Sequence, residues 1–90
     1  MTGESRVPAF RRGVKFRFDT VRGAWTVLAP ERMFVPDEQA VEVLKLIDGA
    51  RGLGAIADDL AARYDAPRAV ILPDVAALLD DLAAKGVLTW

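Results

Sequence analysis

The sequence predicts an α+β domain in which a three-stranded antiparallel meander is followed by three helices, in a winged-helix-like arrangement. Residues 14–35 alternate apolar and polar side chains between short turn signals, as half-buried strands do. Residues 37–85 repeat apolar side chains at steps of three and four, as amphipathic helices do. The chain has 90 residues, 52% of them apolar, which is enough for one domain with a compact core.

The beginning of the chain and the first strand differ in composition. Residues 1–12 mix Gly, Ser, Pro and Arg without periodicity, so we expect a flexible tail there and a folded domain over residues 13–90. Residues 14–19 alternate without a break and predict the first strand. The side chains expected to face the core are Val14, Phe16 and Phe18.

Two further strands complete the predicted meander. Residues 20–23 form a turn, in which Gly23 is free to adopt a positive φ. Residues 25–29 are rich in aromatic and β-branched side chains and predict the second strand. Pro30 presets φ for another turn, and residues 33–35 return as the third strand.

Three helices are expected after the meander. The first begins after Asp37, whose carboxylate can cap it, and ends at Gly49. The second spans residues 53–64 and the third spans residues 67–85. Pro73 lacks an N–H, so the third helix either kinks there or begins its regular part there. The apolar stripes are Ala40, Val41, Val43, Leu44 and Ile47; Leu53, Ile56, Ala57, Leu60, Ala61 and Tyr64; and Ile71, Val75, Leu78, Leu79 and Leu82.

The composition argues against an enzyme. The chain has no histidine and no cysteine, so it lacks the commonest general base, the commonest metal ligand and a thiolate nucleophile. Its only serine is Ser5, and no glycine-rich phosphate loop is present. We therefore expect no catalytic residue, metal or cofactor. No apolar run approaches the roughly 20 residues of a membrane helix, so we expect a cytoplasmic protein that does not bind a membrane.

The third strand is the predicted binding site. Residues 33–35 carry no charge, although natural sheets usually protect their edges with charged side chains. Either this edge is too short to need protection, or it stays open for an extended peptide that adds a strand. The third helix would form the opposite wall, although plain core packing explains its apolar residues equally well. The predicted contact residues are Arg32, Met33, Phe34 and Val35 on the strand, and Ile71, Asp74, Val75 and Leu78 on the helix.

A winged helix can also bind nucleic acid, which requires a basic reading helix. The predicted third helix carries Arg68 and Lys85 against Asp74, Asp80 and Asp81. Phosphates would be repelled by this helix, so the sequence favours a peptide over a nucleic acid as the ligand.

Four segments in this order resemble the PqqD family: residues 30–31 with the apolar strand that follows, 43–49, 56–60 and 74–86. The resemblance covers about residues 8–88. The sequence departs from the family pattern at three places. These are Arg32, where Gly is usual, Pro36-Asp37, where Leu-Asn is usual, and Gly52, where Thr or Ser is common.

The resemblance implies a peptide chaperone without catalysis of its own. PqqD-like proteins bind the precursor peptide PqqA and present it to the radical S-adenosylmethionine enzyme PqqE during pyrroloquinoline quinone biosynthesis. In the wider group the peptide adds a strand beside the third strand and packs against the third helix. The module also recurs in other peptide-modification pathways, which is the alternative function, and it occurs fused to neighbouring pathway enzymes.

Overall fold

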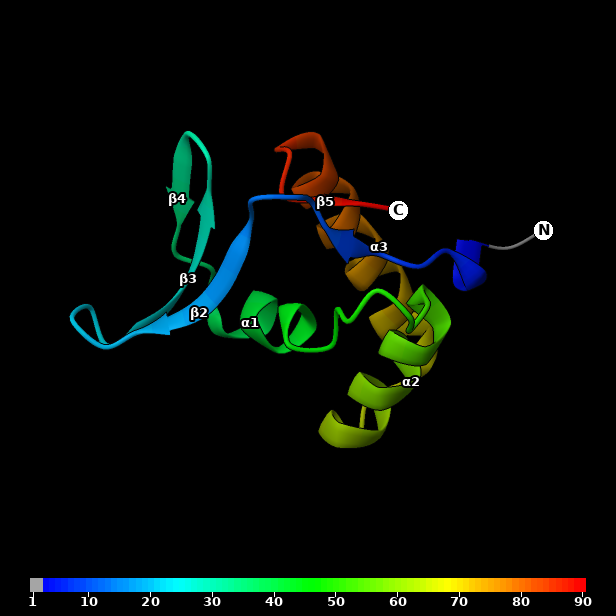
Figure 1. The fold of residues 1–90 in the computed structure, drawn as a ribbon. Helices are drawn as coiled ribbons and strands as arrows, with labels where there is room; N and C mark the ends of the chain where they lie inside the picture. The colour runs from blue at the N-terminus through cyan, green and yellow to red at the C-terminus, as the bar shows by residue number, and fades with distance from the viewer. Residues whose placement is uncertain (1–2) are drawn as a thin grey trace.

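A three-stranded antiparallel sheet forms the front of the molecule in the computed structural model, which describes residues 3–90. The strand order is β2-β3-β4, as predicted (Figure 1). Val27 on the central strand pairs with Phe16 on one side and with Phe34 on the other. Since Val27 is buried, these three side chains share the face turned toward the core. The strands are β2 (Lys15–Asp19), β3 (Ala24–Ala29) and β4 (Arg32–Phe34).

Two predictions about these strands are wrong in detail. Phe18 lies on the same face of β2 as Phe16, as predicted, but it is not buried in the core, because 48% of it is exposed. It lies near the turn of the β2–β3 hairpin, which projects beyond the helices (Figure 1). Val35 was expected in the third strand, but β4 ends at Phe34. The following Pro36 has no N–H to continue a ladder, which explains the early end.

Three helices follow the sheet, which confirms the predicted α+β class. Asp37 caps the first, because its Oδ1 accepts a hydrogen bond from the Ala40 amide at 2.8 Å. This helix ends at Leu44 rather than near Gly49, and single turns carry the chain onward. The third helix runs without a break through Pro73, so residues 67–72 do not form a separate turn. The helices are α1 (Glu38–Leu44), α2 (Leu53–Tyr64) and α3 (Arg68–Ala84).

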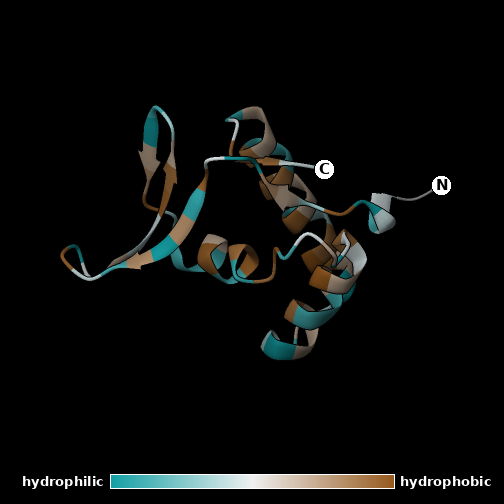
Figure 2. Cartoon of the chain, in the orientation of Figure 1, coloured by the Kyte–Doolittle hydropathy of each residue, from teal (hydrophilic) through white to brown (hydrophobic). Residues whose placement is uncertain are grey.

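The core lies between the three helices and the inner face of the sheet. The apolar sides of the helices turn toward one another, as the hydropathy colouring of Figure 2 shows. Ile56 on α2 and Leu79 on α3 are fully buried, and Val87 after α3 folds back onto them. None of the helices within residues 3–90 combines the length and apolar character needed to cross a membrane.

The segment predicted as a tail packs on the body of the protein. Strand β1 (Ala9–Phe10) pairs antiparallel with β5 (Leu88–Thr89) near the other end of the chain. Pro8 is buried, and Phe10 packs partly against the core. Residues 1–12 were expected to form a flexible tail, whereas within them Glu4, Arg6 and residues 9–10 contact distant parts of the chain, between Leu53 and Trp90. Residues 1 and 2 lie outside the described residues.

Side chains hold the same segment in place. The Arg6 guanidinium lies 4.0 Å from the ring centroid of Trp90 and donates a hydrogen bond to its backbone carbonyl at 3.1 Å. Glu4 binds Arg68 at the start of α3, and Arg68 also binds Asp58 on α2. The two ends of the described chain are thus joined to each other and to the helices.

Candidate peptide-binding site

Strand β4 is an open edge of the sheet. Within residues 3–90 it pairs only with β3, so its outward N–H and C=O groups have no strand partner. Met33 pairs with Leu28, and Phe34 pairs with Val27, so Met33 and Phe34 point to opposite faces. Phe34 is half-buried and anchors the strand, whereas 42% of Met33 is exposed. The edge therefore offers backbone groups and an apolar side chain to an added strand.

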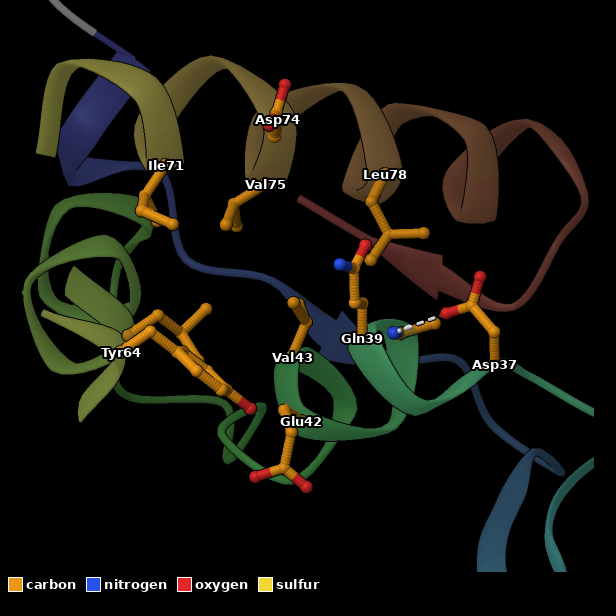
Figure 3. Close-up of a pocket in the computed structure, with 11 residues that line it drawn as sticks. Asp37, Gln39, Glu42, Val43, Tyr64, Ile71, Asp74, Val75 and Leu78 are labelled. Atoms are coloured by element: carbon orange, nitrogen blue, oxygen red, sulfur yellow. Dashed lines mark hydrogen bonds between the residues drawn. The ribbon is translucent and has the colours of Figure 1, made fainter. Parts of the chain in front are cut away.

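A groove of about 410 Å³ lies between the three helices. All four helix residues predicted from the sequence line it: Ile71, Asp74, Val75 and Leu78. Figure 3 shows Ile71, Val75 and Leu78 pointing from α3 toward α1. Val43 and Gln39 on α1 point back toward them (Figure 3). The structure therefore brings the predicted helix residues together in one concave site.

Burial distinguishes the roles of these apolar residues. Val75 is only 4% exposed and belongs to the hydrophobic core, so plain packing accounts for it. Ile71 and Leu78 are half-buried and pack on the edge of that core. They keep apolar surface open to the groove, which is the property expected of residues that contact a ligand.

The groove and the strand edge are separate but adjacent in sequence. Arg32 and the three residues after it do not line the groove. Asp37 does line it, and it comes three residues after Phe34, the last residue of β4. In Figure 3 Asp37 lies at the end of the groove where the chain enters α1. The short connection through Val35 and Pro36 thus joins the two parts of the candidate site.

Several lining residues were not predicted as contacts. Tyr64 was predicted only as the last residue of the apolar stripe of the second helix, but 54% of it is exposed and it lines one end of the groove (Figure 3). Its position at the end of the α2 stripe was the signal for this role. The spacing of Gln39 and Val43 on one face of α1 was another. The additional lining residues are Asp37, Gln39, Ala40, Glu42 and Val43 from the α1 region, and Leu60 and Tyr64 from α2.

The chemistry of the groove suits binding. Most of its lining side chains are apolar, and Gln39 and Tyr64 add groups that can form hydrogen bonds. In the part of the chain that the structure describes, no group of three or more acidic side chains is placed to hold a metal ion.

A protein-family model matches this chain and identifies its family. The model described as coenzyme PQQ synthesis protein D (PqqD) matches residues 24–88, from β3 to the start of β5. The chain belongs to the PqqD family. The matched region contains both β4 and α3, so the open edge and the groove lie within the part that the family shares.

Relatives with known names support this assignment. The chain is 52% identical over 86 residues to a PqqA binding protein of Bradyrhizobium diazoefficiens, covering 96% of this chain and 84% of that protein. It is 49% identical to a bifunctional coenzyme PQQ synthesis protein C/D of Methylorubrum extorquens, covering 93% of this chain and 23% of that protein. In that relative the PqqD-like region is therefore one part of a longer chain.

A solved structure agrees with the fold. The solution structure of the PqqD part of PqqCD from Methylobacterium extorquens matches with a TM-score of 0.81 at 47% sequence identity, covering 97% of this chain and 93% of that one. That protein is described as a functional, stand-alone recognition element for ribosomally synthesised and post-translationally modified peptides.

Proposed function

We propose that this PqqD-family chain binds the precursor peptide PqqA and presents it to the radical S-adenosylmethionine enzyme PqqE, without catalysing a reaction itself. The observation that carries the proposal is an open edge strand, β4, adjacent in sequence to a partly apolar groove lined by α3. A relative that is 52% identical is named PqqA binding protein. The name of that relative and the geometry of this chain therefore point to the same class of ligand, an extended peptide.

Strand addition explains how β4 would hold the peptide. Backbone hydrogen bonds along the edge supply affinity and register without regard to side chains. By the register with β3, Arg32 and Phe34 lie on the core side, and Met33 lies on the other side. Side chains of the peptide would alternate in the same way, so every second one would face the helical side of the sheet.

The groove would supply the specificity that the strand edge lacks. Ile71 and Leu78 keep apolar surface open, and Val75 forms the floor between them. Burying an apolar peptide side chain there gains about 1.5–3 kcal/mol relative to leaving it in water. Asp74 also lines the groove from α3, and in Figure 3 its exposed carboxylate points away from α1. We infer that the peptide follows β4 and then places apolar side chains against α3.

Presentation to PqqE requires no chemistry from this chain. A peptide that is held near the enzyme reacts at an effective concentration set by the tether, which reaches the millimolar range for short connections. A free precursor peptide is expected to be disordered, so part of the binding energy is spent on ordering it. The module would thus act by positioning the peptide.

The test is an amide NMR titration of the ¹⁵N-labelled chain with synthetic PqqA, with a scrambled peptide of the same composition as control. We expect saturable shifts at Arg32–Val35 and along Ile71–Leu78, and none of these with the scrambled peptide. Shifts confined to the β2–β3 hairpin, or no shifts with excess PqqA, would contradict the proposal. Adding unlabelled PqqE to the complex should then broaden a second set of amides, which would identify the enzyme-facing surface.

A further inference from the structure

The groove carries an uneven distribution of charge. Three carboxylates line it, those of Asp37, Glu42 and Asp74, and no lysine or arginine does. Its remaining lining residues are uncharged. The sign of the field in the groove therefore depends on which carboxylates are matched by cations from outside it.

Glu42 is matched. Arg63 on α2 donates to one of its carboxylate oxygens at 3.0 Å, and Lys45 donates to the other at 3.3 Å. Two cations around one carboxylate leave no excess negative charge at this point of the groove. The charge of Glu42 is thus accounted for by the fold itself.

Asp74 is not matched in this way. Among the described residues it forms no ion pair, although the other two aspartates of α3 have partners. Asp81 pairs with Lys85 at 2.9 Å, and Asp80 accepts a hydrogen bond from the Trp90 indole at 3.2 Å. Asp80 forms no ion pair among the described residues either, since the indole is neutral, but it does not line the groove. Asp74 is therefore the α3 aspartate whose unpaired charge lies at the groove.

Asp37 adds to the same field at the other end of the groove. It makes a hydrogen bond to the Ala40 amide and, within residues 3–90, no ion pair. The positive end of α1 offsets part of its charge. Its contribution is accordingly expected to be smaller than that of Asp74.

We infer that this groove selects a cationic apolar segment, in which leucine- or isoleucine-like side chains enter between Ile71 and Leu78 and a lysine or arginine lies against Asp74 or Asp37. The inference rests on the proposed function and narrows the class of peptide that the module accepts. A cation at the rim can reach a carboxylate while its aliphatic stem stays on apolar surface. An acidic segment would meet like charge and be rejected.

The test uses three short acetylated and amidated peptides with the same leucine and isoleucine positions and with Lys, Gln or Glu at the positions between them. Their dissociation constants are measured by NMR shifts of the Ile71–Leu78 amides at about 0.05 M and about 0.5 M salt, since salt screens exposed charges. The variants are Asp74→Asn and Asp37→Asn; the second keeps a side chain that caps a helix equally well. Asp81→Asn is the matched control, because it removes the same charge from α3 about 10 Å further along, where Lys85 already pairs with it.

We expect the Lys peptide to bind several-fold tighter than the Glu peptide at low salt and the difference to shrink at high salt. Asp74→Asn and, more weakly, Asp37→Asn should reduce affinity for the Lys peptide about two- to fivefold, as exposed ion pairs typically do, while Asp81→Asn should not. Equal affinities for the three peptides, no groove shifts with the Lys peptide, or unchanged affinity in both groove variants would overturn the inference. So would concentration-dependent groove shifts without peptide, because a second copy of the chain would then occupy the groove.

PqqA itself separates this inference from the proposed function. If PqqA binds along β4 but the groove shows no preference for the Lys peptide, only the inference fails. If the groove prefers the Lys peptide but PqqA does not bind, the proposed function fails while the charge preference stands.

Discussion

The backbone amide of Leu53 donates a hydrogen bond to the carbonyl of Arg6 at 2.9 Å. This bond joins the start of α2 to the N-terminal segment. It satisfies an amide at a helix start where Gly52, the N-cap residue, provides no side-chain hydrogen bond. A Cβ at Gly52 would lie only 2.9 Å from the Glu4 carbonyl oxygen. Glycine at position 52 therefore has a structural reason, since the segment before β1 occupies the space that a side chain would need.

Gly52→Ser is predicted to destabilise the protein, although serine is normally among the best N-cap residues. The backbone of the N-terminal segment would have to move away from α2, and we expect a loss of about 1–3 kcal/mol, as for other overpacked sites. Urea unfolding followed by circular dichroism measures this loss. Gly3→Ala is the control, because its Cβ would make only an ordinary contact, 3.7 Å from Arg6. A stabilised Gly52→Ser variant would mean that the segment moves aside without cost.

The ion pair between Glu4 and Arg68 should make stability depend on pH in the acid range. The hydrogen bond from Arg68 lowers the pKa of the Glu4 carboxyl, so its contribution is complete above the ordinary glutamate pKa of about 4.3. The contribution is lost as the pH falls through the lowered pKa, because the protonated carboxyl binds Arg68 less strongly. In the Glu4→Gln variant, the part of the pH dependence of stability that comes from this ion pair should be absent.

Urea midpoints at about pH 6 and about pH 3 measure that difference. The wild-type chain should lose more stability between the two values than Glu4→Gln does. Glu31→Gln serves as control, since Glu31 is exposed and forms no ion pair among the described residues. Identical losses in the wild type and Glu4→Gln would show that the pair does not stabilise the fold.

Strand addition at β4 predicts an alternating response to backbone methylation of the peptide. An N-methyl group removes one amide donor, and only every second amide of an added strand points toward its neighbour. Methylation at one set of alternate positions should therefore abolish binding to this chain, and methylation at the other set should leave it nearly unchanged. Fluorescence anisotropy with labelled PqqA variants measures both. A uniform effect at all positions would argue against an added strand.

The two phenylalanines of β2 should differ in their contribution to stability. Phe16 stacks on Trp25 with ring centroids 4.8 Å apart and on Phe10 at 6.1 Å. Phe18 touches the edge of the Trp25 ring and remains about half exposed. We expect Phe16→Ala to cost about 1–3 kcal/mol and Phe18→Ala less than about 1 kcal/mol, measured by urea unfolding. The reverse order would mean that the projecting part of the hairpin is more important for stability than its base.

The regular elements could be predicted from the sequence because each is long enough to show a period. The stripe of α2 and the alternation in β2 each repeat several times within one element. The pairing of Ala9–Phe10 with Leu88–Thr89 could not be predicted in this way. Two residues show no period, and their partners are about 80 positions away. Sequence alternation also placed Phe18 on the correct face of β2 without indicating that the helices end before they cover it.

Only the part of the candidate site that lies on one helix could be predicted from the sequence. The stripe of α3 identified Ile71, Val75 and Leu78 correctly as one face, and the structure places all three in the groove. That stripe did not distinguish the buried Val75 from its half-buried neighbours, because a helix face is apolar whether a core or a ligand covers it. Local patterns place Gln39 on one face of α1 and Tyr64 at the end of the α2 stripe. Whether these faces line a groove depends on how α1 and α2 approach α3, which no local pattern encodes.

The β1–β5 pair also constrains the order in which the molecule is assembled during translation. Residues 9 and 10 leave the ribosome well before residues 88 and 89, their partners, because about 80 positions separate them. Closing so long a loop is entropically costly unless the intervening residues have already folded. The β1–β5 pair, and with it the contact of Arg6 with the start of α2, is therefore expected to form last. The start of α2 should then be protected from hydrogen exchange later than α3 in a pulse-labelled refolding reaction.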